Sequence, residues 1–149
     1  MENGPGSAKT CMSGADFLDT NVVVYAYDGE NPRKQQLARQ LLKGGVAGRV
    51  VISAQVLAEF AATMLHKASP PATAEAVIEG LDALASIRLI LTDAELVRRA
   101  VEARVSYGLH FYDGMIVAAA ERAGCARIWS EDFHEGQEYF GVMVANPFA

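Results

Sequence analysis

Residues 49–68 read RVVISAQVLAEFAATMLHKA. The run over 49–52 is short, compact and apolar, which is typical of a buried strand. Ser53 follows it in the position of a helix N-cap, and the pattern beyond Ser53 predicts a helix that continues to about residue 68. A strand that passes directly into a long helix is the repeating unit of α/β proteins.

The same alternation extends in both directions along the chain. Strands are predicted over 15–18, 88–91, 126–129 and 142–144, and helices over 22–27, 32–42, 70–86, 92–108 and 112–123. The helix over 22–27 is preferred to a longer first strand, although its residues are β-branched and aromatic. Because strands separated by helices pair in parallel through crossovers, we expect an α/β fold: a three-layer α/β/α sandwich with a central parallel sheet.

The length of 149 residues favours one domain, which we place over residues 14–149. Residues 1–13 are rich in small and polar residues without periodicity, and they are interpreted as a flexible N-terminal extension. No apolar run is long enough to cross a membrane, and no secretory signal is recognised. Cys11 and Cys125 lie far apart without a pairing motif, so we expect a reducing, cytoplasmic setting.

The formal net charge is −5, from 13 basic and 18 acidic residues. A protein that holds nucleic acid through phosphate contacts alone is usually basic. The charge therefore argues against sequence-independent coating of DNA. It is compatible with an enzyme that cuts RNA, provided that a local basic rim or bound cations attract the phosphates.

Four acidic residues fall where ligands bind in open parallel sheets, beyond the carboxyl ends of the strands. Asp19 follows the first predicted strand, and Asp132 follows the strand over 126–129. Glu59 lies in the second turn of the helix after Ser53, and Asp113 begins a helix that is apolar on nearly every face. The fold class thus predicts that four distant carboxylates converge on one edge of the sheet.

Each acid also has a purely structural interpretation. Asp19 and Asp113 are suited to cap helices, Glu59 suits a solvated helix face, and Asp132 is an ordinary turn residue. Taken singly, none of the four decides the function.

Converging carboxylates repel one another, and burial without compensation costs several kcal/mol per ion. Such a site requires bound cations or raised pKa values. Oxygen ligands without His or Cys favour Mg²⁺ or Mn²⁺. These ions activate a bound water and stabilise charge at a phosphoryl centre.

Taken together, the segments that carry the four acids resemble the successive motifs of the PIN domain. The motifs are FLDTNV at 17–22, IS at 52–53 with VLAEF at 56–60, FYDGMIVAAA at 111–120 and SEDF at 130–133. The resemblance runs from about residue 15 to 147, and the VapC-type toxins of toxin–antitoxin pairs are the most similar subgroup. Tyr112 and Gly114 depart from the common residues of the third motif, but neither is among the expected ligands.

The resemblance implies a metal-dependent endoribonuclease that acts as a toxin, with Mg²⁺ or Mn²⁺ as cofactor. Its catalytic and metal-binding acids are Asp19, Glu59, Asp113 and Asp132, supported by Thr20, Asn21 and Ser130. The implied partners are an RNA substrate, a cognate antitoxin whose tail covers the active site, and a second copy of the chain. Composition also favours a homodimer, because the helices, including residues 22–27 and 70–86, carry more apolar surface than one small sheet is expected to cover. Glu131 beside Asp132 leaves open which of these two acids is the ligand.

Two other functions are compatible with the sequence. One is a catalytically silent PIN scaffold that binds proteins. The other is a phosphohydrolase of the haloacid-dehalogenase kind, but that chemistry needs a second acid where Asn21 stands. The sequence does not identify which RNA is cleaved.

Overall fold

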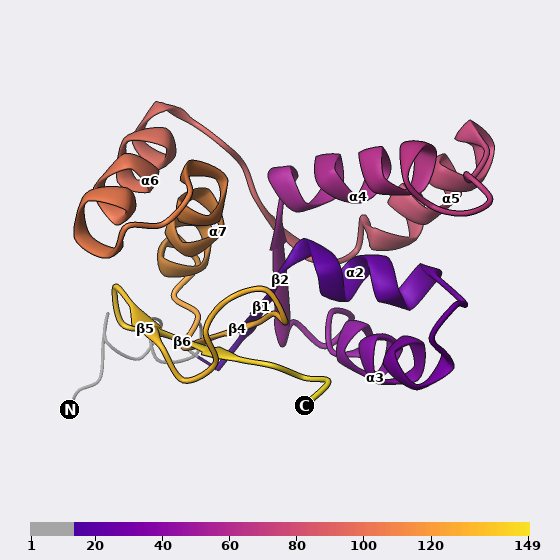
Figure 1. The fold of residues 1–149 in the computed structure, drawn as a ribbon, viewed down its shortest axis with the longest axis horizontal. Coiled ribbons are helices and arrows are strands. Elements are labelled where there is room, and N and C mark those ends of the chain that lie inside the picture. Colours follow the sequence, from indigo (N-terminus) through magenta and orange to yellow (C-terminus); the bar gives the residue numbers. More distant parts are fainter. Residues whose placement is uncertain (1–13) are drawn as a thin grey trace.

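Six strands in the described part of the chain form one sheet in the order β3-β2-β1-β4-β6-β5 (Figure 1). The computed structural model describes residues 14–149, and the expected extension over 1–13 lies outside this range. The strands are β1 (Asp16–Leu18), β2 (Val50–Ser53), β3 (Arg88–Ile90), β4 (Arg127–Trp129), β5 (Glu138–Tyr139) and β6 (Val142–Ala145). The helices are α2 (Thr20–Tyr27), α3 (Pro32–Lys43), α4 (Ala54–His66), α5 (Ala74–Leu84), α6 (Ala94–Tyr107) and α7 (Phe111–Arg122).

The sheet is parallel from β3 through β6, as the alternation of strands and helices predicts. Leu18 at the end of β1 lies opposite Trp129 at the end of β4. The residues that follow these two strands therefore lie side by side at one edge of the sheet. This edge carries the candidate site.

Helices cover both faces of the sheet, which confirms the α/β/α sandwich. Figure 1 shows α6 and α7 on one side of the sheet and α2, α3, α4 and α5 on the other. The core consists of the strands together with the inner faces of α2, α4 and α7. Within residues 14–149, no helix has the length and apolar character needed to span a membrane.

The short helix predicted over 22–27 is confirmed, and it begins earlier, at Thr20. Val22 and Val23 are fully buried, and they explain why β-branched residues are tolerated here: packing outweighs their preference for strands. Because this face is already covered within the chain, the expectation that residues 22–27 supply a dimer surface is wrong for these valines.

Two helix starts differ from the sequence prediction. Helix α5 begins at Ala74 with Thr73 as N-cap, and not at Pro70. Pro70 precedes Pro71, and a residue before proline is disfavoured in helical conformation. Helix α6 is capped by the Asp93 carboxylate, which accepts a hydrogen bond from the Leu96 backbone, so the capping box predicted at 92–95 does not describe this end.

Strand β5 was not predicted, and it makes the sheet mixed, because β5 pairs antiparallel to β6. Only two residues long, it offers no alternating pattern to recognise. Phe140 (φ 51°) and Gly141 (φ 83°) form the tight turn between the two strands. Two successive residues with positive φ are the signature of a two-residue hairpin turn.

Gly114 lies where α7 crosses α6 at short distance. A Cβ atom at this position would lie 2.6 Å from the carbonyl oxygen of Ala100. The added Cβ would clash with a backbone atom, which cannot move aside as the end of a flexible side chain can. We therefore expect Gly114→Ala to lower the free energy of unfolding by about 1–3 kcal/mol. Gly29→Ala is the matched control, since no atom lies within 4 Å of its added Cβ. Urea titration of both variants tests this, and equal stability of the two would contradict it.

Candidate active site

Asp19 stands at the point where β1 ends and α2 begins. It is the N-cap of α2, and its side chain is only 6% exposed. The Thr20 backbone N–H and the Ser130 hydroxyl each donate a hydrogen bond of 2.7 Å to its carboxylate. Burial nevertheless raises the pKa of Asp19 to about 6. The two hydrogen bonds lower the pKa, and the charges of Asp132 and Glu59 raise it further.

Asn21 and Ser130 join Asp19 to Asp132. The Asn21 amide donates to the carboxylates of Asp19 (3.3 Å) and Asp132 (3.0 Å) and to the Ser130 hydroxyl oxygen (3.1 Å). The Asp132 backbone N–H also donates to the Ser130 oxygen, at 3.0 Å. Ser130 is fully buried. The two polar residues expected to support the acids therefore hold them in place.

Glu59 reaches the site from the second turn of α4. Its carboxylate accepts two hydrogen bonds, one from the Thr20 hydroxyl, with 2.6 Å between the oxygens, and one from the Gln55 amide nitrogen at 3.1 Å. The same amide donates to the backbone carbonyl of Tyr112 in α7. Gln55 thus links the helix of Glu59 to the helix of Asp113. Sequence reasoning did not assign Gln55 a role, although its position four residues before Glu59 is the available signal.

Asp113 lies in the first turn of α7 but does not cap it. The N-cap is His110, whose Nδ1 accepts a hydrogen bond from the Tyr112 backbone. Partial burial raises the pKa of Asp113, the charge of His110 lowers it, and the charges of Asp132 and Glu59 raise it further. The capping interpretation of Asp113 is therefore wrong, and its carboxylate lies within electrostatic range of two other acids of the site.

Glu131 is bound by other side chains. The Tyr25 hydroxyl donates a hydrogen bond of 2.6 Å to the Glu131 carboxylate, and the Lys34 ammonium forms an ion pair with the same carboxylate at 2.8 Å. Partial burial raises the pKa of Glu131, but the hydrogen bonds from Lys34 and Tyr25 outweigh burial, so the pKa lies below its ordinary value. Asp132, bonded to Asn21, is the acid of this pair that faces the other carboxylates.

The charges of Glu59 and Asp132 raise the pKa of both Asp19 and Asp113, but the four carboxylates are not close enough together to hold one ion. Among residues 14–149, no three Asp, Glu, His or Cys side chains are spaced to hold one ion as they stand. Instead, neutral donors from Thr20, Asn21 and Ser130 satisfy carboxylate oxygens that a cation would use. The donor chemistry fits a hard divalent cation, because every ligand offered is a carboxylate oxygen.

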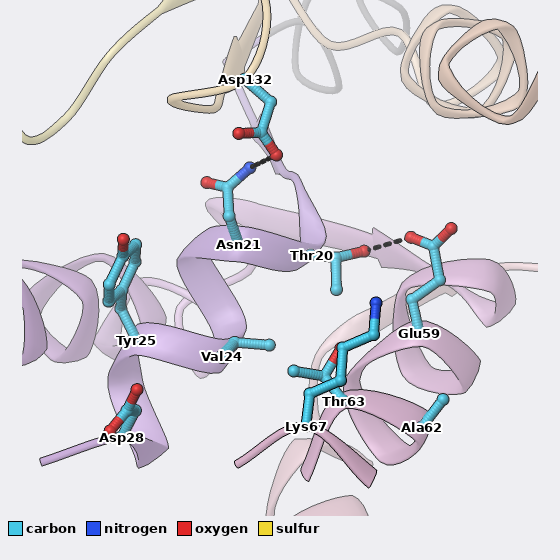
Figure 2. Close-up of a pocket in the computed structure, with 10 residues that line it drawn as sticks. All are labelled: Thr20, Asn21, Val24, Tyr25, Asp28, Glu59, Ala62, Thr63, Lys67 and Asp132. Carbon is cyan, nitrogen blue, oxygen red and sulfur yellow. Dashed lines mark hydrogen bonds between the residues drawn. The ribbon is translucent and has the colours of Figure 1, made fainter. Parts of the chain in front are cut away.

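Two hollows meet at Asp132. The larger, of about 520 Å³, runs between α2 and α4 and includes Thr20, Asn21 and Glu59 (Figure 2). The smaller, of about 360 Å³, is lined by Asp113 together with aromatic side chains of the C-terminal segment. An extended polymer has room on both sides of the acids.

Comparison with solved structures finds the same fold in toxin–antitoxin proteins. A toxin–antitoxin complex from Klebsiella pneumoniae has a TM-score of 0.65 at 20% identity, with 89% of this chain and 98% of that chain covered. VapC20 of Mycobacterium tuberculosis, a toxin that cleaves the sarcin–ricin loop, has a TM-score of 0.64 at 18% identity, with 79% and 90% covered. VapBC2 of Rickettsia felis, bound to a promoter DNA fragment, has a TM-score of 0.61 at 20% identity, with 89% and 98% covered.

Sequence comparison gives the family directly. No curated protein sequence matches the chain. The family model of the PIN domain matches residues 17–134, a range that includes the four acids and the three polar residues that bond them. The chain therefore belongs to the PIN domain family.

Proposed function

We propose that this protein is a metal-dependent endoribonuclease that hydrolyses RNA phosphodiesters as the toxin of a toxin–antitoxin pair. One observation carries the proposal: the elements of the fold bring the charges of Glu59 and Asp132 close enough to raise the pKa of both Asp19 and Asp113. A cluster of partly desolvated carboxylates opposes folding unless it serves a cation.

The cation that suits these oxygen donors is Mg²⁺ or Mn²⁺. When bound, it would supply an activated water and neutralise charge at the phosphoryl group. The residues of the chain prepare the site for it: Ser130 and the Thr20 backbone fix Asp19, and Asn21 fixes Asp132. These hydrogen bonds hold Asp19 and Asp132 near one another, and a cation would replace some of them as it draws the carboxylates together.

The rival functions are less well supported by the same contacts. A haloacid-dehalogenase-like hydrolase needs an acid at the position of Asn21, whose amide instead donates to Asp132 and Ser130. A silent scaffold would need Asp19 only as the N-cap of α2, and that role does not account for the charges of Glu59 and Asp132 placed beside it.

A cleavage assay tests the proposal. We expect labelled single-stranded RNA to be cut with Mn²⁺ or Mg²⁺ present and to remain intact in EDTA, because the acids alone lack a charge-neutralising partner. Cleavage that persists in EDTA would contradict a metal-dependent mechanism. Intact RNA under both conditions favours the silent scaffold, and phosphate release from small phosphomonoesters without RNA cleavage favours the dehalogenase-like chemistry.

We also propose that a cognate antitoxin and a second copy of the chain are its partners, and that it acts in the cytoplasm. The similar folds of toxin–antitoxin complexes support the antitoxin. For the homodimer, the exposed apolar side chains in the described residues lie mainly outside 22–27, for example Val97, Val101 and Val105 along α6. A spacing of four residues places these three on one helix face.

A further inference from the structure

The groove between α2 and α4 opens at one end onto the acidic site. Thr20, Asn21, Glu59 and Asp132 line this end, and Val24, Ala62 and Thr63 form part of its walls. At about 520 Å³, it is of a size that binds small ligands or a short piece of a polymer. Figure 2 shows the Lys67 side chain in this groove, with its ammonium group directed toward the end where Thr20 and Glu59 lie.

Most basic side chains of residues 14–149 are already engaged. Ion pairs bind Lys34, Arg98, Arg99, Arg122 and Arg127 to carboxylates. Hydrogen bonds to backbone carbonyls hold Arg33, Arg39, Arg88 and Arg104. A basic group that is already paired offers less to an incoming phosphate, because its own partner must first be displaced.

Lys43, Arg49 and Lys67 remain, and their side chains make no hydrogen bond or ion pair within the described residues. Lys43 lines shallow hollows at α3, away from the acids. Lys67 alone of the three lines the groove that leads to the acidic site. Within the described part of the chain, it is the only lysine or arginine that lines this groove, and Asp28, Glu59 and Asp132 are among the other lining residues.

The second hollow beside the acids has a different character. Asp113 and Asp132 line it with Phe133, His134 and Tyr139, and no lysine or arginine from residues 14–149 is among its lining residues. With a formal net charge of −5, the protein repels a polyanion at long range. A basic side chain beside the site that has no carboxylate partner therefore contributes strongly to the binding of a phosphate backbone. Of the two hollows, only the one between α2 and α4 is lined by a basic side chain from residues 14–149.

We propose that Lys67 binds a backbone phosphate of the RNA adjacent to the one that is cleaved, so that the strand follows the α2–α4 groove into the acidic site. The inference rests on the proposed function, since it presumes an RNA ligand. A mobile ammonium at the end of an exposed side chain suits a phosphate, because it needs no fixed angle of approach. Val24, Ala62 and Thr63, which line the groove beside Lys67, have short side chains.

Binding to a catalytically impaired protein tests this without depending on cleavage. Asp113→Asn protein is titrated against a fluorescent single-stranded RNA with Mn²⁺, at several salt concentrations, by anisotropy. Adding Lys67→Gln is expected to weaken binding about fivefold, the upper range for an exposed ion pair. It should also reduce the steepness of the salt dependence by about 0.7, the value for one phosphate contact on a single strand.

Lys43→Gln is the matched control, since it removes the same charge at a residue that does not line the groove, and Lys67→Arg should retain binding. In the otherwise unchanged enzyme, Lys67→Gln should raise KM more than it lowers kcat. If Lys67→Gln and Lys43→Gln bind RNA equally, or if no RNA binds, the inference is overturned. If RNA binding depends on Lys67 but the wild type cleaves no RNA, the inference stands and the proposed function fails.

Discussion

Asp113→Asn is expected to reduce metal-dependent RNA cleavage by a factor on the order of 10²–10³, the usual loss when one electrostatic group of a reaction centre is removed. An amide of the same shape replaces an anionic ligand, so the divalent ion loses a charged oxygen. Cleavage of labelled RNA under single-turnover conditions measures the effect.

The same substitution is expected to stabilise the metal-free protein. Asp113 carries a pKa raised by burial and by the charges of Asp132 and Glu59, so removing its charge relieves repulsion. Although part of Asp113 is desolvated, much of the residue remains in contact with solvent, and solvent screening limits the gain to less than about 1 kcal/mol. In a chain of this size, that is at most about 2–4 °C in melting temperature. Mn²⁺ should then stabilise the wild type more than the variant.

Glu131→Gln is the control for this pair of measurements. It removes a charge from the same edge of the sheet, but that charge is engaged by Lys34 and Tyr25. We expect it to keep most of the cleavage activity and to gain no stability in EDTA. If Asp113→Asn retains activity, or if it destabilises the protein in EDTA while Mn²⁺ shifts both proteins equally, Asp113 has a structural role only.

The order of elements was predictable because each carries its own local signal. Asn31 and Ser53 cap helices as expected, and the strand predictions agree with β1 to β4 and β6. Where a local signal is absent, prediction failed: β5 is too short to show a pattern, and its turn uses Phe140 with positive φ, which the residue type does not indicate.

The proximity of Asp19 to Ser130 in the candidate site was predictable for a different reason. In a parallel sheet, the residues after β1 and β4 must be neighbours, which brings Asp19 beside Ser130. The distinction between Glu131 and Asp132 was not predictable, because it depends on contacts with Tyr25 and Lys34, more than 90 positions away in the chain. Adjacent residues with the same charge carry no local mark that separates a ligand from an ion-pair partner.

The stability of the metal-free protein is expected to fall as the pH rises through the range where Asp19 ionises. In the folded state the pKa of Asp19 is raised from 3.8 to about 6. Between these values the folded protein binds the proton that the unfolded chain releases, so acid favours the folded state. The full shift corresponds to about 3 kcal/mol at 1.36 kcal/mol per pKa unit, of which about 1 kcal/mol falls between pH 5 and 7.5.

Other carboxyls do not mask this slope. The pKa values of Asp93, Glu102 and Glu131 are lowered in the folded state, so their contributions are complete above the ordinary carboxyl range and are lost only in stronger acid. Urea titrations in EDTA at pH 5 and 7.5 therefore report mainly on Asp19 and, in the same direction, Asp113. Asp19→Asn should flatten most of the difference, and a wild type that is more stable at pH 7.5 than at pH 5 in EDTA would contradict the assignment.

A bound divalent cation is expected to counteract this loss of stability with rising pH. A cation bound by the ionised Asp19 competes with the proton, so below a pH of about 6 each further unit lowers the apparent metal affinity up to tenfold. Mn²⁺ is therefore expected to raise the melting temperature strongly at pH 7.5 and little at pH 5. A shift of equal size at both pH values would place the ion away from Asp19. Burial makes the ionised Asp19 carboxylate unfavourable in the metal-free protein. Because the same burial leaves the carboxylate poorly solvated, it has little water to lose when it binds a cation. Asp19 therefore lowers the stability of the metal-free fold and at the same time favours the metal binding that the proposed reaction needs.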